Sequence, residues 1–274
     1  MHEYIDKNKG VIAKYHQDPL GWEKDAQRNL AKQNLQFLLN VISERNFEPF
    51  SRKDVVNAYN TSLYKGVICL LLWGGMHLNN LGSLLKILEI PQNEIEAKLK
   101  NAKSLLVRKE LGNALDSMLE GRNKIQNIGP SYATKILYFM SKAFDEITIS
   151  PQPLIFDRHM QYVHAALLIA DENNEESSVL SFYSYSRKTL RNKNYKEAYL
   201  DFCKRMWSAC RREFESDKLE AYMFNNKSDD PEKASPREYV KQYVDNYFRN
   251  YKCNMSVREE TLGGRNGIKR KGRE

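Results

Sequence analysis

The stretch KIQNIGPSYATKILYFMSKAFDEITISPQPLIFDRHMQYV, residues 124–163, decides the fold that the sequence predicts. Asn127 and Gly129 tolerate a positive φ better than other residues. They stand two positions apart between apolar neighbours, so the backbone can reverse sharply there. Pro130 follows at the place of a first helical residue, whose N–H would lack a partner inside the helix anyway. These residues predict a helix, a hairpin and a second helix.

The predicted hairpin is a candidate phosphate site. It directs backbone N–H groups and the positive end of the second helix outward, an arrangement that binds a phosphate without reading any base. Duplex DNA is an obvious source of such phosphates. We therefore expect DNA contacts from Lys124, Asn127, Gly129 and Ser131. For Arg122, also just before the turn, a solvated charged surface is an equal alternative.

One face of the second helix is predicted to border a pocket. Ser131, Lys135 and Tyr138 recur at i, i+4 and i+7, so they share a face, while apolar residues occupy the others. Trp73 ends the most apolar segment, residues 62–73, just before two glycines. We expect that segment to be a buried central helix, and Trp73 to be either a core residue or a wall of the same pocket.

An aspartate closes the stretch. After a loop with two prolines comes the apolar run Leu154-Ile155-Phe156, and then Asp157, which is placed to cap a helix that starts at Arg158. The sequence therefore predicts a carboxylate held at the start of a helix.

These residues resemble the motif of the helix-hairpin-helix DNA glycosylases, and most closely that of their 8-oxoguanine branch. The turn alone occurs in many DNA binders that are not enzymes, whereas the turn with a spaced aspartate is rarer. The matching residues are Ile125, Asn127, Ile128-Gly129, Tyr132-Ala133 and Phe156-Asp157-Arg158-His159.

The resemblance implies a fold and a chemistry. The fold is all-α, with two helical lobes and DNA across the cleft between them. The enzyme rotates a nucleotide out of the duplex and reads its base in a pocket, for which Ser131, Tyr138 and Trp73 are candidates. Asp157 is implied as the catalytic carboxylate and His159 as a phosphate contact, although Asp157 as a plain helix cap is the structural alternative.

The chain departs from the family pattern in two places. Strand-cleaving members have a lysine two residues after Gly129, where this chain has Ser131, and a hydroxyl cannot form a Schiff base. The resemblance therefore implies a monofunctional glycosylase. Lys135, one turn further, is a candidate for the missing amine, a surface or phosphate-contacting lysine, or a contact to the flipped base. The second departure is the loop before Asp157, which is longer than the family pattern.

Composition fits a DNA-binding protein and, equally, a soluble basic protein without such a partner, and it predicts no metal or cofactor. Lysine and arginine number 43 against 35 acids, and the net charge of +8 favours a polyanionic partner without identifying it. The four cysteines are too scattered for disulfides or an iron–sulfur cluster, so we expect core thiols and no cofactor. No Cys/His spacing predicts a metal site. With no signal peptide or membrane span in view, we expect a cytoplasmic monomer, nucleoid-associated if prokaryotic.

We divide the chain by composition and pattern. Residues 1–225 are expected to form the glycosylase-like domain, with lobes at 1–120 and 121–225. Residues 226–252 form a linker and a C-terminal helix, and residues 253–274 a basic, disordered tail. Further helices are predicted at 22–45, 80–88, 92–101, 104–120, 180–190 and 195–214.

The function predicted from the sequence is a DNA glycosylase that leaves an abasic site. Oxidised guanine as the excised base follows from the resemblance alone, and mismatched, alkylated or bulky bases stay open. A role in DNA repair and a role in defence against modified foreign DNA are both open. The rival hypotheses are a glycosylase that also cleaves the strand through Lys135, and a hairpin module that binds DNA without chemistry.

Overall fold

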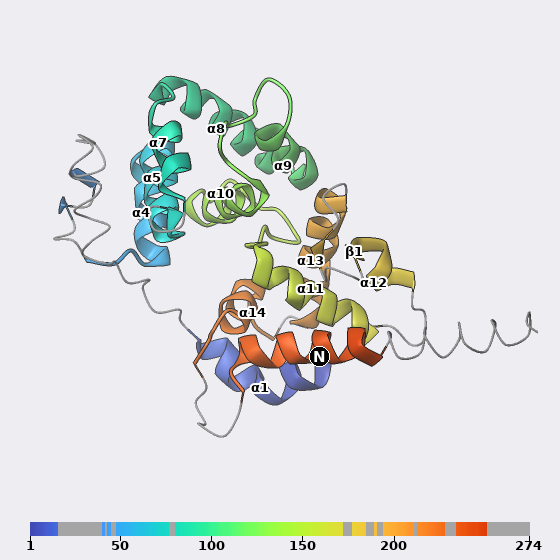
Figure 1. The fold of residues 1–274 in the computed structure, drawn as a ribbon. Helices are drawn as coiled ribbons and strands as arrows, with labels where there is room; N and C mark the ends of the chain where they lie inside the picture. Colours follow the sequence, from blue (N-terminus) through green and yellow to red (C-terminus); the bar gives the residue numbers. More distant parts are fainter. Residues whose placement is uncertain are drawn as a thin grey trace, which may run out of the picture.

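The computed structural model describes residues 1–15, 40–41, 43–44, 48–76, 80–171, 177–184, 189–190, 194–210, 213–227 and 234–250. These residues are mainly helical, which confirms the all-α prediction (Figure 1). The elements are α1 (His2–Lys14), α4 (Arg52–Thr61), α5 (Leu63–Trp73), α7 (Leu81–Leu88), α8 (Gln92–Val107), α9 (Leu111–Leu119), α10 (Pro130–Ala143), α11 (Arg158–Asp171), α12 (Ser177–Phe182), β1 (Tyr183–Ser184), β2 (Thr189–Leu190), α13 (Tyr195–Ala209), α14 (Ser216–Met223) and a helix over 236–250.

Helices α4 and α5 begin at side-chain caps. The Ser51 hydroxyl accepts from the Asp54 N–H at 3.2 Å, and the Asp54 carboxylate accepts from the Ser51 N–H at 2.8 Å. Ser62 caps α5 in a similar way through the Lys65 N–H. Helix α5 is buried along nine of its residues, and Gly75 follows it with φ +74°. The prediction of a buried central helix ended by glycine is therefore confirmed.

In the turn between α9 and α10, one of the two residues chosen for their tolerance of a positive φ adopts one. Asn127 adopts φ +65°, the left-handed conformation that asparagine tolerates. Gly129 does not: its φ of −90° and ψ of 172° are extended, and it serves as the N-cap residue of α10. Ile125 and Ile128 are buried and anchor the turn, and Gly121, earlier in the same connection, adopts a second positive φ of +64°.

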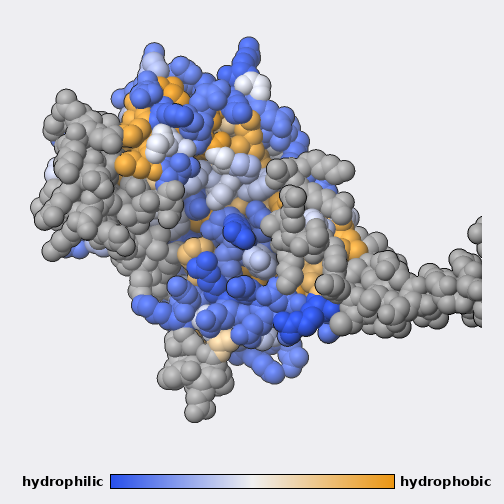
Figure 2. All heavy atoms as spheres, viewed as in Figure 1, coloured by the Kyte–Doolittle hydropathy of each residue, from blue (hydrophilic) through white to orange (hydrophobic). Residues whose placement is uncertain are grey.

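Some helices pack against partners that are distant in the sequence. Helix α10 packs on α4, α5, α8 and α9, whereas α1 packs on α14. Figure 1 shows α1 beside the helix over 236–250, where the rings of Tyr4 and Tyr239 stack with centroids 4.0 Å apart. The N-terminal helix thus joins the C-terminal half, and the domain boundaries themselves stay a prediction. Figure 2 shows a largely hydrophilic surface over α1 and the helix over 236–250, in the lower part of the view.

Two helix predictions were wrong. Helix α8 runs to Val107 without the break expected after residue 101, because Ala102, Leu105 and Leu106 continue its buried face. The chain turns instead at Lys109, with φ +63°. Residues 180–190 do not form one helix, since α12 ends at Phe182 and Tyr183 pairs with Leu190 in a short antiparallel ladder.

Some predictions lie outside the described residues, namely most of the helix at 22–45 and the tail at 253–274. None of the helices in the described part of the chain has the length and apolar character that crossing a membrane requires.

Candidate active site

Asp157 caps α11 as predicted. Its Oδ1 accepts hydrogen bonds from the backbone N–H groups of His159 at 3.0 Å and Met160 at 3.1 Å. The residue before it is fixed on both sides, because the Phe156 N–H donates to Thr134 of α10 and the Phe156 carbonyl accepts from Tyr195 of α13. The carboxylate is therefore held rigidly between two helices, with its side chain 16% exposed.

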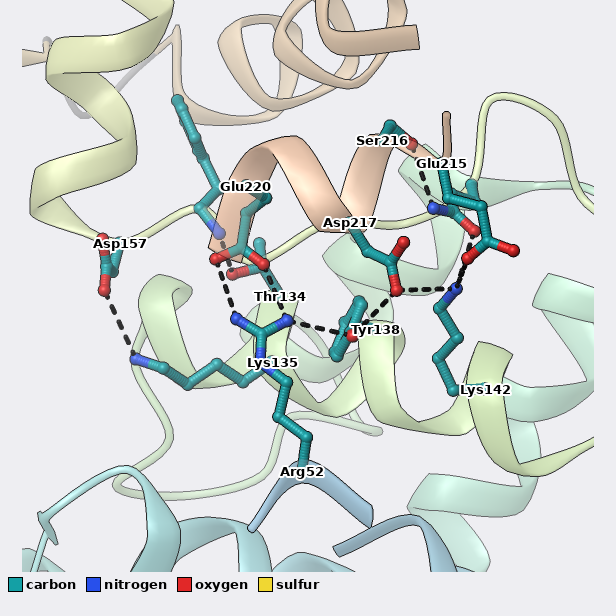
Figure 3. Close-up of polar contacts among 12 residues, drawn as sticks. Arg52, Thr134, Lys135, Tyr138, Lys142, Asp157, Glu215, Ser216, Asp217 and Glu220 are labelled. Carbon is teal, nitrogen blue, oxygen red and sulfur yellow. Dashed lines mark hydrogen bonds and ion pairs between the residues drawn. The ribbon is translucent and has the colours of Figure 1, made fainter. Parts of the chain in front are cut away.

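Lys135 is buried, so its interpretation as a surface lysine was wrong. Its Nζ donates to the Ser131 hydroxyl at 3.2 Å. The same Nζ lies 3.9 Å from Oδ2 of Asp157 (Figure 3). The ring of Tyr132 is 4.9 Å from the same Nζ. Burial lowers the pKa of Lys135, and the negative charges of Asp157 and Glu220 oppose this effect in part. The amine is thus closer to its neutral, nucleophilic form than an exposed lysine would be.

Asp157 and Lys135 share a small cavity of about 90 Å³. Figure 3 shows the charged ends of the two side chains pointing toward each other. Aromatic and apolar groups form much of the remaining wall, with a second pair of charged groups. The lining residues are Arg52, Trp73, Gly74, Lys135, Ile155, Asp157, Glu220 and Phe224.

Trp73 fits both of its predicted roles. It is 5% exposed and packs edge-on against Phe139 with centroids 5.1 Å apart, as a core residue does. It also lines the cavity. Gly74 lets α10 approach, because the Tyr132 hydroxyl donates to the Gly74 carbonyl and its ring would collide with a Cβ on Gly74.

The sequence did not reveal the second charged pair of the cavity. Arg52, the first residue of α4, donates from Nη1 to Oε2 of Glu220 at 2.9 Å and from Nη2 to Oε1 at 3.2 Å. Glu220 lies on α14 and its side chain is 1% exposed. Burial raises the pKa of Glu220, and the adjacent guanidinium opposes that rise. The signal in the sequence that could have indicated this pair is Glu220 itself, a carboxylate between Leu219 and Met223, two apolar residues that are buried in α14.

A chain of polar contacts connects this pair to the long loop before Asp157. Tyr138 accepts from Arg52 and donates to Asp217, and Lys142 binds Asp217 at 2.9 Å. Lys142 also donates to the Gln152 side chain, whose amide donates to Ser216 (Figure 3). The loop, which is longer than the family pattern, thus reaches across to the start of α14. Tyr138 was predicted to line the pocket; its hydroxyl points to this network instead of lining the cavity.

The predicted phosphate contacts fall into two groups. Lys124, Asn127 and Gly129 are exposed on the turn, and Lys98 supports it by donating to the Lys124 carbonyl at 2.9 Å. His159 is different, because its ring is 7% exposed and Nε2 lies 2.7 Å from the Met223 carbonyl. Burial lowers the pKa of His159, which favours the neutral ring. A phosphate contact from His159 stays a prediction, and here the ring joins α11 to α14.

The possible metal ligands of the described residues are histidine, cysteine, aspartate and glutamate side chains, and the cysteines are also possible reactive thiols. No group of three or more histidine, cysteine, aspartate or glutamate side chains in that part of the chain could hold a metal ion. Cys203 and Cys210 are free and buried, as the core interpretation predicted, and burial raises the pKa of each to about 12.

The fold and the site define an all-α protein in which a helix-capping aspartate and a buried lysine share one cavity, beside a turn with exposed backbone. The chain belongs to the family described as "Putative 8-oxoguanine DNA glycosylase OGG-like protein", which matches residues 14–224. This confirms the resemblance drawn from the hairpin and the aspartate. The comparisons with curated proteins and with solved structures gave no match. The family description is that of a DNA glycosylase, so DNA is the partner that it indicates.

Proposed function

We propose that this protein is a DNA N-glycosylase that hydrolyses the bond between a damaged or modified base and its sugar. The observation that carries the proposal is the placement of Asp157. One carboxylate oxygen is fixed by two backbone N–H groups, and the other faces the cavity and Lys135. Family membership supports the same reaction class.

The reaction needs a negative group at a fixed position. As the C1′–N bond breaks, positive charge develops on the sugar, and a rigid carboxylate in a site with little water stabilises that charge most effectively. The same carboxylate can orient or deprotonate the attacking water. Asp157 is 16% exposed and cannot turn away without losing its bonds to α11, so it fits this role.

The substrate is proposed to be duplex DNA bound by a monomer. The exposed turn with Lys124, Asn127 and Gly129 supports a phosphate contact close to the start of α10. From there α10 leads to Lys135, which lines the cavity and donates to the Ser131 hydroxyl one turn before it. A nucleotide rotated out of the duplex near this turn would have its sugar at Asp157 and its base in the cavity. Such chemistry serves both DNA repair and defence against modified foreign DNA.

The test is base release by wild type and by Asp157→Asn from duplexes that each carry one modified base. Asparagine is also a good N-cap residue, so the substitution removes the charge and largely keeps the helix start. We expect abasic sites, revealed as strand breaks after alkali, from wild type and not from Asp157→Asn. The control is Asp116→Asn, because Asp116 pairs with Lys196 at the surface away from the cavity. If Asp157→Asn releases bases as fast as Asp116→Asn does, the catalytic role of Asp157 is wrong.

The position of Lys135 favours a second candidate function, cleavage of the strand after base release. An abasic sugar in its open form is an aldehyde, and a buried amine with a lowered pKa adds to it to form an imine. Elimination of the 3′ phosphate then follows loss of a proton from C2′. Borohydride would trap the imine as a covalent protein–DNA complex in wild type and not in Lys135→Met. The control is Lys142→Met, which removes a lysine from the same helix. Breaks that always require alkali, without trapping, would exclude this activity.

If the protein binds duplex DNA but releases no base from any of the duplexes, the hypothesis of a non-catalytic binding module replaces both candidates. Binding and release are therefore measured on the same duplexes.

A further inference from the structure

A positively charged side chain from the C-terminal helix lies at the edge of the cavity that Asp157 and Lys135 share. Arg237, at the start of the helix over 236–250, places its guanidinium carbon 5.5 Å from the centre of the Phe224 ring. Phe224 lines the cavity, whereas Arg237 does not. The guanidinium therefore lies beside a wall of the cavity and outside its lining.

The backbone at the start of this helix is fixed by hydrogen bonds. Ser235 Oγ accepts from the Glu238 N–H at 3.3 Å, and the Glu238 carboxylate accepts from the Ser235 N–H at 3.2 Å. Pro236 has no N–H to satisfy, and the Arg237 N–H donates to the Asn225 carbonyl at 3.2 Å, just after α14. Because the protein itself satisfies these N–H groups, a ligand at this place is bound by the Arg237 side chain and not by the helix N-terminus.

The donors of the Arg237 guanidinium are open to a ligand. The side chain is exposed, and none of the side chains that the structure describes accepts a hydrogen bond from it or forms an ion pair with it. Its contact with Phe224 is a cation–π contact, which orients the guanidinium and uses the face of the group rather than its N–H edge. A planar guanidinium with free N–H groups matches the oxygens of a phosphate.

Arg237 also provides a positive charge where His159 does not. The His159 ring contacts the same Phe224 ring, with centroids 5.9 Å apart, and its backbone N–H binds Asp157. Burial lowers the pKa of His159, the bond to the Met223 carbonyl opposes this effect, and the charge of Arg237 lowers the pKa further. The permanent positive charge next to His159 is therefore that of Arg237.

We propose that Arg237 binds a DNA phosphate next to the nucleotide whose base enters the cavity. This deepens the proposed function, from which it takes DNA as the ligand. When a base enters the cavity, the phosphates on both sides of its sugar stay outside, and Arg237 lies outside the lining beside the Phe224 wall. The contact comes from a part of the chain that follows residues 14–224, which the family model matches.

The experiment measures the affinity of Arg237→Gln for two labelled duplexes of one sequence. One duplex is undamaged, and the other carries at its centre a tetrahydrofuran sugar, which offers no base to release. We expect the substitution to weaken binding of the tetrahydrofuran duplex by about 10-fold, and to reduce the slope of log K against log salt by about 0.9. Binding of the undamaged duplex, whose nucleotides stay stacked, should change by less than about threefold.

Two further variants separate the phosphate contact from a general effect of charge. Arg249→Gln is the matched control, because it removes the same charge from an exposed position of the same helix, about 18 Å further along its axis. Arg237→Lys keeps the charge, so its salt slope should equal that of wild type even where its affinity is lower. A reduced slope in Arg237→Lys would contradict a phosphate contact. Thermal unfolding of each variant shows that the fold is intact.

The inference and the proposed function fail in different ways. Equal affinity of Arg237→Gln and Arg249→Gln for the tetrahydrofuran duplex would overturn the inference. An equal loss on both duplexes would overturn it as well, because the contact would then be to fully stacked DNA. Base release by wild type is measured separately. If wild type releases a base and Arg237→Gln binds normally, the inference alone is wrong. If wild type releases none and Arg237→Gln still loses affinity, the proposed function alone is wrong.

Discussion

Gly129 provides a sharp test of the phosphate site, because nothing inside the protein explains why this residue is glycine. Its φ of −90° and ψ of 172° lie in the region open to every residue. A methyl group built on it would have no heavy atom within 4 Å. The substitution Gly129→Ala therefore leaves the fold intact and fills the space in front of the first N–H groups of α10. A glycine at such a place allows a ligand to approach the backbone closely.

Gly129→Ala is expected to change the free energy of unfolding little and the dissociation constant for DNA strongly. Alanine is a weaker N-cap residue than glycine, but it also restricts the unfolded chain, so the free energy of unfolding should change by less than about 1 kcal/mol. Loss of a charge-assisted contact between the backbone and a phosphate costs about 1.5–3 kcal/mol, or about 10- to 150-fold in Kd. The slope of log K against log salt should also fall by about 0.9, the value for one phosphate.

The assay measures fluorescence anisotropy of a labelled, undamaged duplex at several salt concentrations, together with thermal unfolding. Gly82→Ala is the matched control, because Gly82 of α7 also has open space around a Cβ and is remote from the turn in sequence. If Gly129→Ala binds DNA as tightly as Gly82→Ala does, with the same salt slope, the turn does not hold a phosphate. A large loss of stability in Gly129→Ala would contradict the open space seen at this position.

Three further predictions follow from burial. Burial lowers the pKa of Lys135 from its ordinary 10.5, so borohydride trapping should rise with pH and level off below pH 10.5; a continued rise through pH 10.5 would contradict the buried amine. Gly66→Ala places a Cβ 2.4 Å from the buried ring of Tyr59, and should lower the melting temperature by about 3–10 °C, since overpacking costs about 1–3 kcal/mol. An unchanged melting temperature would show that Tyr59 can move. Cys203 and Cys210, with pKa values raised to about 12, should resist iodoacetamide in the native protein at pH 8, as peptide mapping would reveal.

Local features of the site were predictable because they depend on a few neighbouring residues. Asn127 takes the positive φ that its side chain tolerates, and Pro130 begins α10 because its ring fits a first helical turn. Asp157 caps α11 through bonds to residues two and three positions later. The spacing of Ser131 and Lys135 places them on one face, and their side chains are in contact. Each of these contacts spans at most four residues of the chain.

The helical class, the turn before α10 and the capped aspartate could be predicted from local patterns, because periodicity and capping act over one or two helical turns. Which charged side chains meet depends on how the helices pack. Arg52 and Glu220 are 168 residues apart, and the burial that lowers the pKa of Lys135 comes from helices far from it in sequence. The resemblance implied His159 as a phosphate contact, and in the structure its ring lies against α14, with Nε2 2.7 Å from the Met223 carbonyl. Such contacts depend on how whole helices pack, and no local pattern encodes that packing.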